Sequence, residues 1–290
     1  MTHKSHKLYP FALTALAMLA FAANSVLARL ALSTPDIGPW GFTTIRLISG
    51  ALILTLIAKS RQTESSGNWI SAASLLLYAA CFSYAYLQLA AGTGALILFA
   101  AVQITMIGGG LISGERLSKL QWLGTAIAVI GLIYLLSPNI EAPPLFGALL
   151  MMVSGLGWGL YSLRGRKAGD PTAQTTGNFV KAGIICAIAT PFILSGLQLG
   201  LIHESAPNTK GVLLALASGT VTSALGYVIW YMALKHLTAT RAGIAQLTVP
   251  VIAAFGGMIF ISEPLTLRFM ILSTIILAGV GIATMTRRKT

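Results

Sequence analysis

Aromatic and amide side chains recur four residues apart inside long apolar stretches of this sequence. Tyr78 and Phe82 form one such pair, and Phe99 and Gln103 form another. Side chains at this spacing lie one above another on a helix, where they can line a cavity together. The other residues of this set are Asn24, Trp158, Tyr161, Tyr227, Trp230 and Gln246. We predict that the set lines a substrate-binding cavity, with interfacial aromatic belts and core packing as the alternative.

Two cations, Arg46 and Lys181, also lie well inside apolar stretches. A charge at the centre of a membrane helix costs about 2.5–3.5 kcal/mol on insertion scales. One explanation is that each long side chain reaches the lipid headgroups or makes a structural hydrogen bond. The other explanation is contact with the carboxylate of an anionic or zwitterionic substrate. Both residues are therefore candidates for the binding site, and the sequence leaves both explanations open.

Acidic side chains are missing from the middle of the apolar stretches, because all seven carboxylates lie near segment ends. Proton-coupled pumps commonly relay protons through intramembrane Asp, Glu or His. We therefore expect neither a simple cationic substrate nor obligatory proton coupling through a carboxylate. Cys81 and Cys186 both lie in apolar runs and the four histidines are far apart, so no disulfide, metal site or cofactor is expected.

The elements that would position these side chains follow from the composition. Of the 290 residues, 56% are hydrophobic and only 9% are charged, whereas soluble proteins carry about 25% charged residues. Lipid is therefore the expected solvent, and the fold class is all-α integral membrane. A spanning helix needs about 20 apolar residues. Ten such segments can be read, at 8–32, 38–58, 69–91, 93–113, 119–137, 144–164, 173–199, 210–235, 240–261 and 265–286.

The basic residues predict the orientation of these helices. The net charge of +12 does not indicate nucleic acid, because the 19 Lys and Arg mostly occur between apolar segments and form no basic domain. With the N-terminus in the cytoplasm, fourteen of them lie on the cytoplasmic side and two on the other side. This bias predicts that both termini are cytoplasmic. The first apolar stretch exceeds the 7–15 residues usual for a signal peptide, so we expect it to remain as a helix.

A repeat divides the chain into two units, 1–139 and 140–290. The sequence around Glu115 resembles the sequence around Glu263, at an offset of 148 residues. Each unit holds five predicted helices, and because five is odd the second unit must insert upside down relative to the first. Inverted repeats are typical of secondary transporters, whose substrate site lies near the membrane midplane between the halves. We therefore predict ten helices arranged as two inverted five-helix repeats around a central cavity.

Several short motifs carry a resemblance to a known family. They are Gly114-Glu115-Arg116-Leu117, Gln121-Trp122-Leu123-Gly124 and Gly131-Leu132 in the first unit, and Pro250, Ser262-Glu263-Pro264-Leu265 and Gly279-Val280 in the second. With the five-plus-five layout, the whole chain resembles the EamA-type branch of the drug/metabolite transporter (DMT) superfamily and, within it, the YddG-like amino-acid exporters. The resemblance implies a central cavity walled by helices 1, 3, 4, 6, 8 and 9, with helices 5 and 10 outside.

Prolines inside two predicted helices are candidate hinges. Pro191 and Pro250 each remove a backbone hydrogen bond from an apolar segment, which is tolerated where neighbouring groups or a cavity satisfy the freed carbonyl. The first unit has Val102 at the place that matches Pro250, so the two units need not bend alike.

These observations favour a secondary transporter that exports small metabolites, with hydrophobic or aromatic amino acids as the first substrate class. Aromatic walls, a cation and no carboxylate suit such a substrate, and other amphipathic metabolites or drugs are the alternative. An intramembrane lipid-modifying enzyme would need a nucleophile–base pair or a metal cluster, which is not visible. A receptor or scaffold would need long loops, and a channel would need a filter ring. We expect a monomer in the bacterial inner membrane with no partner besides lipid and substrate.

Overall fold

The computed structural model describes residues 5–112, 117–137, 142–165, 169–199, 204–237 and 245–284, and these contain helices and no β-strand. The elements are α1 (Ser5–Leu32), α2 (Pro39–Ser60), α3 (Trp69–Tyr86), α4 (Ala91–Ile112), α5 (Lys119–Leu136), α6 (Leu145–Gly165), α7 (Pro171–Gln198), α8 (Thr209–Ala217), the π-helical η1 (Ser218–Leu225), α9 (Gly226–Leu234), α11 (Thr248–Ile261) and α12 (Leu267–Thr284). Within these described residues, eight spans are long and apolar enough to cross a membrane, and α11 and α12 are shorter apolar helices. The predicted all-α membrane fold is confirmed.

Polar caps explain where several helices begin. At the start of α5, the Ser118 hydroxyl accepts the Gln121 N–H at 3.2 Å, and the Gln121 side chain accepts the Ser118 N–H at 2.8 Å. Asn68 likewise accepts the Ser71 N–H at the start of α3. Such caps satisfy backbone donors that have no partner in the first helical turn. The predicted starts of these two helices therefore agree with the structure, whereas the Glu115 turn lies outside the described residues.

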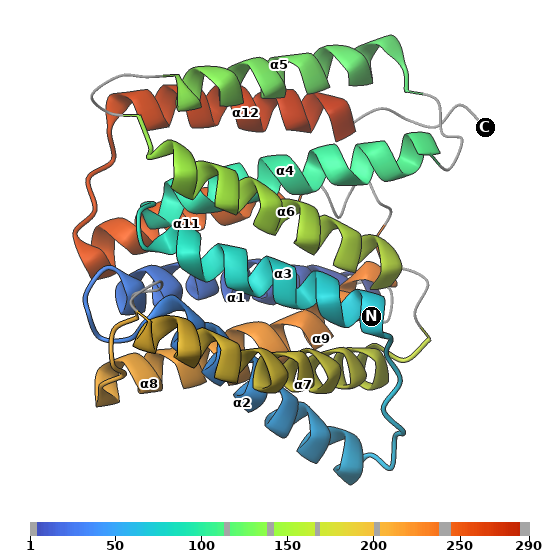
Figure 1. The fold of residues 1–290 in the computed structure, drawn as a ribbon. Helices are drawn as coiled ribbons and strands as arrows, with labels where there is room; N and C mark the ends of the chain where they lie inside the picture. Colours follow the sequence, from blue (N-terminus) through green and yellow to red (C-terminus); the bar gives the residue numbers. More distant parts are fainter. Residues whose placement is uncertain are drawn as a thin grey trace.

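The helices lie side by side, with their ends gathered at two opposite faces of the bundle (Figure 1). We name these faces the Arg29 end, where α1 ends, and the Arg164 end, where α6 ends. Successive spans run in alternate directions, so α1 runs toward the Arg29 end and α6 runs away from it. α5 and α12 pack mainly on each other and form one edge of the bundle, away from the centre.

Contacts between the first five spans and the last five fall into matched sets. α1 packs on η1, α9 and α11, while α6 packs on α3 and α4. α2 packs on α7, α4 on α11, and α5 on α12. If the first span is paired with the sixth, the second with the seventh and so on, each of these main contacts has a matching contact between the paired spans. This is the packing pattern that two similar five-helix units would produce when they face each other.

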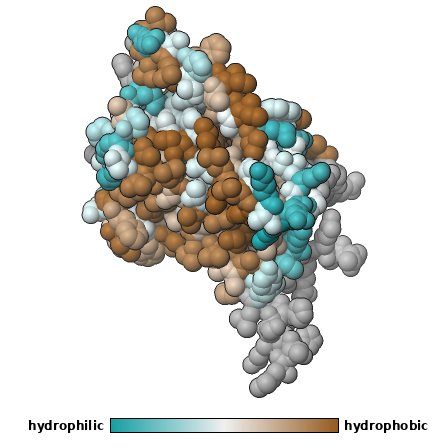
Figure 2. Space-filling model, turned by 90° about the horizontal axis from the view of Figure 1, so that it is seen from below, coloured by the Kyte–Doolittle hydropathy of each residue, from teal (hydrophilic) through white to brown (hydrophobic). Residues whose placement is uncertain are grey.

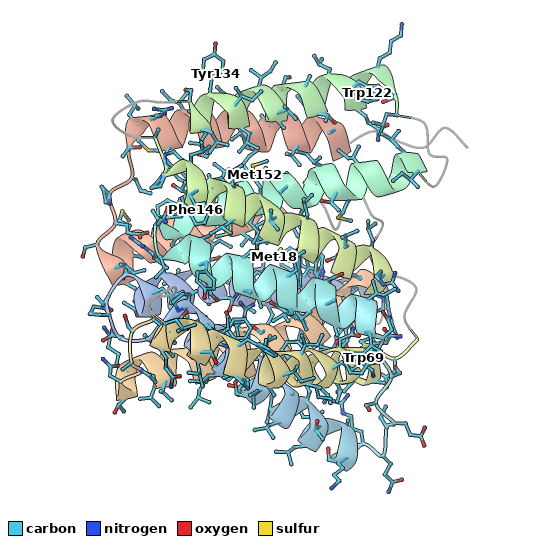
Figure 3. The ribbon with its side chains drawn as sticks, in the orientation of Figure 1. Met18, Trp69, Trp122, Tyr134, Phe146 and Met152 are labelled. Atoms are coloured by element: carbon cyan, nitrogen blue, oxygen red, sulfur yellow. The ribbon has the colours of Figure 1, made fainter. Side chains whose placement is uncertain are left out.

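Large apolar side chains cover the outside of the bundle. Leu52 and Leu56 on α2 and Phe192 on α7 are exposed, and Figure 2 shows hydrophobic residues over much of the face that is lowermost in Figure 1. Such a surface fits contact with lipid tails, because the helices satisfy their own backbone polar groups. Trp122 and Tyr134 point away from the bundle near opposite ends of α5 (Figure 3), where aromatic belts meet lipid headgroups.

The two candidate hinge prolines occupy different kinds of position. Pro250 lies in the first turn of α11, which begins at Thr248, and Ala245 and Gln246 just before this helix are also helical. A proline in the first turn removes no helical hydrogen bond, because those N–H groups have no intrahelical acceptor. Pro191 lies inside α7, which continues without interruption from Pro171 to Gln198. A hinge role for either proline stays a prediction.

Two glycines allow the backbones of α5 and α12 to approach each other closely. A Cβ added to Gly124 would meet the backbone nitrogen of Ala283, and a Cβ added to Gly279 would lie 2.6 Å from the backbone nitrogen of Ala128. Small residues at membrane helix contacts permit this approach, which then gains van der Waals contact along both helices.

We predict that Gly124→Ala lowers the thermal unfolding temperature of the protein in detergent by about 5 °C, because α5 and α12 must separate to admit the methyl group. Gly108→Ala is the matched control, since no atom lies within 4 Å of its new Cβ. The control should leave the unfolding temperature unchanged or raise it, because alanine favours the helix. Equal losses in both variants would contradict the close contact.

Asp36 connects the α1–α2 loop to the start of α8 at the Arg29 end. Its Oδ2 pairs with the Lys210 ammonium at 2.6 Å, and its Oδ1 accepts a hydrogen bond from Asn208 at 2.6 Å. The hydrogen bond from Lys210, followed by those from Thr34 and Asn208, lowers the pKa of Asp36 from 3.8 to about 2. The folded protein therefore prefers the ionised carboxylate more strongly than the unfolded chain does.

A group whose pKa is lowered by folding stabilises the fold above its unfolded pKa, and this contribution disappears as the pH falls through the folded pKa. For Asp36 this contribution is lost as the pH falls from 3.8 to about 2. We predict that wild type unfolds at a higher temperature than Asp36→Asn at pH 5, and that the difference closes near pH 2. Thermal unfolding of both proteins across this pH range tests the prediction, and a difference that does not vary with pH would contradict it.

Candidate functional site

Arg46 lies in the third turn of α2 and is only 1% exposed. Its Nε donates to the Ser223 hydroxyl at 2.7 Å, and its Nη2 donates to the hydroxyls of Tyr78 at 2.8 Å and Tyr227 at 2.7 Å. All three partners are neutral. The two ion pairs in the described part of the chain involve other residues. The interior of the bundle therefore holds a positive charge with no carboxylate paired to it among those residues.

Aromatic ring faces and one unused nitrogen complete the surroundings of Arg46. Its Cζ lies 5.0 Å from the ring centroids of both Tyr78 and Phe82, which is a cation–π distance. Its Nη1 is buried and has no hydrogen-bond partner among the described residues. A guanidinium presents its N–H donors in a fixed planar fork. One edge of that fork is therefore available to an anion.

The π-helical segment η1 presents hydroxyl groups to this part of the bundle. Ser218 and Thr222 of this segment donate to the side-chain oxygen of Asn24, at 2.7 and 3.0 Å. Ser223, from the same segment, accepts from Arg46. The Asn24 amide nitrogen donates to the Tyr78 hydroxyl at 3.3 Å. Short π-helical segments occur frequently at functional sites, and here the segment joins α1, α2 and α3 in one polar network.

Aromatic rings pack around this network, with Phe21 at their centre. The Phe21 ring centroid lies 5.4 Å from that of Trp158, 5.9 Å from Tyr227 and 6.5 Å from Phe99. A cavity of about 10 Å³ remains, lined by Phe21, Ser25, Tyr78, Phe82, Leu98, Phe99, Trp158 and Tyr227. This volume is close to the minimum that holds a single water molecule. The centre of the bundle is therefore closed, and a substrate would enter only after the rings move apart.

The structure brings most of the predicted set together. Seven residues join the polar network or line the small cavity, namely Asn24, Arg46, Tyr78, Phe82, Phe99, Trp158 and Tyr227. Tyr161 and Trp230 extend the cluster toward the Arg164 end. The Tyr161 ring stacks on Trp158 at 5.6 Å, and the Trp230 ring lies 5.7 Å from Phe21. All nine side chains are buried. Their contact with a substrate stays a prediction.

Three predicted residues lie apart from this cluster. Lys181 is half-buried on α7, with its ammonium 6.0 Å from the ring centroid of Trp69 toward the Arg164 end. It does not share a site with Arg46, and its position agrees with a side chain that reaches toward the membrane surface. Gln103 lies on the face of α4 that meets α5 and α12, where it lines a second small cavity. Gln246 is buried just before α11.

Besides Ser25 and Leu98 of the cavity lining, sequence reasoning missed Phe21 and three hydroxyl residues of η1, namely Ser218, Thr222 and Ser223. Phe21 lies in a mostly apolar stretch of α1, and an apolar residue type does not by itself distinguish a cavity-facing position from a lipid-facing one. The three hydroxyl residues did leave a signal. They fall within Ser218–Leu225, a run of small and polar residues in the middle of an otherwise apolar span. A count of hydroxyl groups at mid-membrane depth would have found them.

An apolar bundle with a charged and aromatic centre has the composition of a membrane transporter. The model of the EamA-like transporter family matches residues 9–137 and again residues 145–285. The chain belongs to this family, within the drug/metabolite transporter superfamily. The resemblance predicted from the short motifs is confirmed at this level. The protein is therefore a multi-pass membrane transporter and not an enzyme.

Relatives of this chain match it over nearly its full length. An uncharacterised protein of Pseudomonas aeruginosa is 47% identical over 273 residues, which cover 93% of this chain and 92% of that protein. The threonine/homoserine exporter RhtA of Escherichia coli K12 is 29% identical over 287 residues, 97% of this chain and 92% of its own. The uncharacterised transporter YoaV of Bacillus subtilis is 26% identical over 275 residues, 88% of this chain and 90% of its own.

One solved crystal structure superposes on this chain with a TM-score of 0.62 at 18% sequence identity. The match covers 93% of this chain and 97% of the other. At this identity the likeness shows a shared fold. With the family assignment, it supports a protein that works in the lipid bilayer on a small-molecule substrate.

We predict that Arg46→Met leaves the thermal unfolding temperature in detergent within about 3 °C of wild type, or raises it. Burying an unpaired guanidinium costs desolvation energy, and an apolar side chain of similar volume removes that cost. Lys181→Met is the matched control and should also change little, because Lys181 is only half-buried. A loss of stability confined to Arg46→Met would show that the guanidinium is retained for structure.

Proposed function

We propose that the protein is a secondary exporter of small metabolites, with amino acids as its substrates, and that it works by alternating access. The single observation that carries the proposal is the buried guanidinium of Arg46. It has neutral hydrogen-bond partners, and its Nη1 has no partner among the described residues. A substrate carboxylate would neutralise this charge and accept hydrogen bonds from the open edge of the fork.

The substrate side chain would lie among the aromatic rings. Phe21, Phe82, Phe99 and Trp158 surround the small cavity, and rings of this kind favour a hydrophobic or aromatic side chain. The name of the Escherichia coli relative as a threonine/homoserine exporter supports an amino-acid substrate and adds hydroxyl amino acids to the test set. The hydroxyl groups of η1 are suitable partners for such a substrate. Amphipathic metabolites or drugs that carry an acid group are the second candidate class.

Alternating access would follow from two similar units of opposite orientation. The family model matches the chain twice, in ranges that fall within the proposed units 1–139 and 140–290. The main helix contacts map onto one another when the first five spans are exchanged with the last five. Two such units can pack in two arrangements of similar energy, and each arrangement would open the centre toward one side of the membrane.

The excess of basic residues toward the Arg164 end supports an orientation in which this end faces the cytoplasm, with both termini inside. The proposed membrane is the bacterial cytoplasmic membrane, which the bacterial origin of the relatives supports. All seven carboxylates lie near segment ends in the sequence, which supports transport down a substrate gradient and not proton coupling through an intramembrane acid.

We predict that proteoliposomes containing the protein release labelled phenylalanine or threonine, and that Arg46→Met strongly reduces this release at low substrate concentration. Loss of a charge-assisted pair with a carboxylate should weaken substrate binding by about 10- to 100-fold. The methyl ester of the same amino acid, which lacks the carboxylate, should fail to compete with it. If wild-type protein releases no amino acid of a full panel, the proposal is wrong.

The control variant for this assay is Lys181→Met, which removes the other intramembrane cation. Because Lys181 lies against Trp69 and away from Arg46, this variant should retain transport. Equal losses in both variants would indicate that transport depends on general intramembrane charge and not on a carboxylate site at Arg46.

A further inference from the structure

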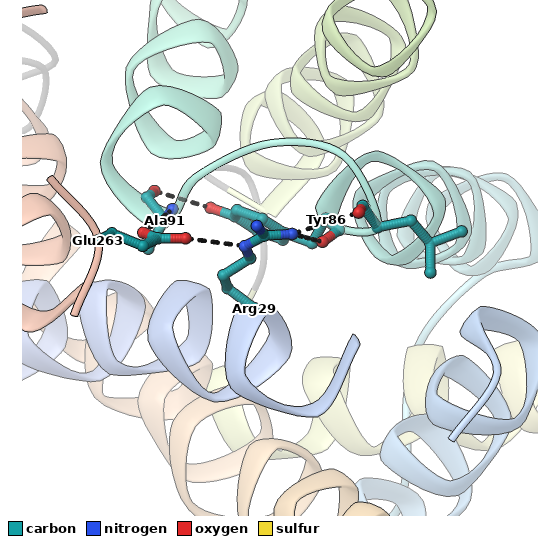
Figure 4. Close-up of polar contacts among 5 residues, drawn as sticks. Arg29, Tyr86, Ala91 and Glu263 are labelled. Atoms are coloured by element: carbon teal, nitrogen blue, oxygen red, sulfur yellow. Dashed lines mark hydrogen bonds and ion pairs between the residues drawn. The ribbon is translucent and has the colours of Figure 1, made fainter. Parts of the chain in front are cut away.

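A second buried polar cluster lies between the closed centre and the Arg29 end. Arg29, in the last turn of α1, donates from Nε to Oε1 of Glu263 at 2.8 Å (Figure 4). Its Nη1 donates to the backbone oxygens of Tyr86 at 2.9 Å and Leu87 at 3.2 Å. The two charged side chains are only 19% and 13% exposed. The pair is therefore largely shielded from solvent.

Glu263 joins the two halves of the chain at this point. Its Oε2 accepts the backbone N–H of Ala91, the first residue of α4, at 2.8 Å. A carboxylate at a helix N-terminus satisfies an otherwise unpaired donor and interacts favourably with the helix dipole. The Arg29–Glu263 pair thus holds α1 and the α3–α4 connection against the connection between α11 and α12.

The pair separates two spaces of very different size. On the inner side, Tyr86 is buried with its ring 4.6 Å from that of Phe82, which lines the closed central cavity. Ser25 also lines that cavity, one turn of α1 before Arg29. On the outer side, a vestibule of about 310 Å³ is lined by both charged residues of the pair. This volume is at the lower end of the range for small-molecule sites, about 300–1,000 Å³.

We propose that Arg29 and Glu263 form the gate of the transport path at the Arg29 end, and that a zwitterionic α-amino acid opens it by taking the place of each partner. The substrate carboxylate would bind Arg29, and the substrate ammonium would bind Glu263. The proposal deepens the proposed function and rests on it for the substrate class. It assigns the vestibule as a second binding site for the α-amino and α-carboxyl groups.

The contacts of the pair favour opening by a molecule that carries both charges. A zwitterion keeps each side chain paired with an opposite charge, whereas an anion leaves Glu263 without one and a cation leaves Arg29 without one. Each residue also keeps a backbone partner when the pair separates, because Glu263 retains the Ala91 N–H and Arg29 retains the Tyr86 and Leu87 carbonyls. The pair can therefore open without leaving either charge bare.

The gate is tested first without any substrate, by the reactivity of a cysteine placed behind it. In a background with Cys81→Ala and Cys186→Ala, Ser25→Cys would be labelled with a hydrophilic thiol reagent in lipid nanodiscs. Ser25 is 3% exposed, so labelling of the closed protein should be slow. Glu263→Gln and Arg29→Gln should each make it severalfold faster. Arg29→Lys, which keeps the positive charge, should restore most of the protection.

Lys210→Gln is the matched control, because it breaks the other ion pair at the same end, with Asp36, away from the path. It should leave the labelling of Ser25→Cys unchanged. Thermal unfolding of each variant shows whether it has kept its fold. If a Gln variant is unfolded, the labelling rates of Arg29→Lys and Glu263→Asp are compared with that of wild type in its place. Labelling that is equally slow in wild type and in folded Glu263→Gln would overturn the gate, whatever the substrate.

The selection for zwitterions is tested with the Ser25→Cys protein, in which Arg29 and Glu263 are unchanged. Its labelling rate is measured with phenylalanine, with threonine and with two derivatives of each. The free amino acids should accelerate labelling of Ser25→Cys, whereas the N-acetyl derivatives and the methyl esters should not. Equal acceleration by a derivative would overturn the selection. If amino acids neither accelerate labelling nor cross liposomes, the proposed function and the selection both fail. If they cross liposomes while Glu263→Gln leaves labelling unchanged, only the gate fails.

Discussion

The arrangement of this protein depends on one constraint. The centre of the membrane bundle holds a guanidinium, and no carboxylate lies beside it among the described residues. Desolvation of Arg46 is offset by hydroxyl groups from α3, η1 and α9 and by two ring faces of α3. Such partners reduce the cost of the charge but do not neutralise it. In a chain this apolar, retaining the charge is understandable if the missing counter-charge arrives with the substrate, as in the proposed function.

The polar groups of the interior are concentrated in layers along the path that the proposed transport would take. The network around Asn24 and Arg46 lies at the centre, the aromatic rings close it, and the Arg29–Glu263 pair lies between it and the vestibule. The edge pair α5 and α12 contributes instead a close backbone contact at Gly124 and Gly279. Chemistry and scaffold are therefore separated in space, with Arg29 and Arg46 on helices that contact both halves of the chain and Glu263 on the connection between α11 and α12.

Hydropathy and short motifs predicted the ten spans and the family, because the cost of placing backbone and charge in lipid restricts a sequence strongly. The same physics could not separate Arg46 from Lys181, since both are cations within apolar segments. The packing of α2 against η1 makes Arg46 central, and the position of α7 near the start of α3 makes Lys181 peripheral. Phe21 was not predictable for a related reason: an apolar residue has the same sequence pattern whether it faces lipid or a cavity. The partner of Arg29 lies 234 residues away, and no local pattern encodes such a contact.

One face of α3 connects the two charged layers directly. Tyr78, Phe82 and Tyr86 follow one another at four-residue spacing, so they lie in a row along the helix. Tyr78 accepts a hydrogen bond from Arg46, the Phe82 ring lies against the same guanidinium, and the Tyr86 carbonyl accepts from Arg29. A helix is stiff along its axis, so a shift of α3 that makes room for a carboxylate at Arg46 also moves the carbonyl that holds Arg29. In the proposed cycle, Arg29 keeps its bonds to the α3 carbonyls, so a movement of α3 at the centre also carries Arg29 relative to Glu263.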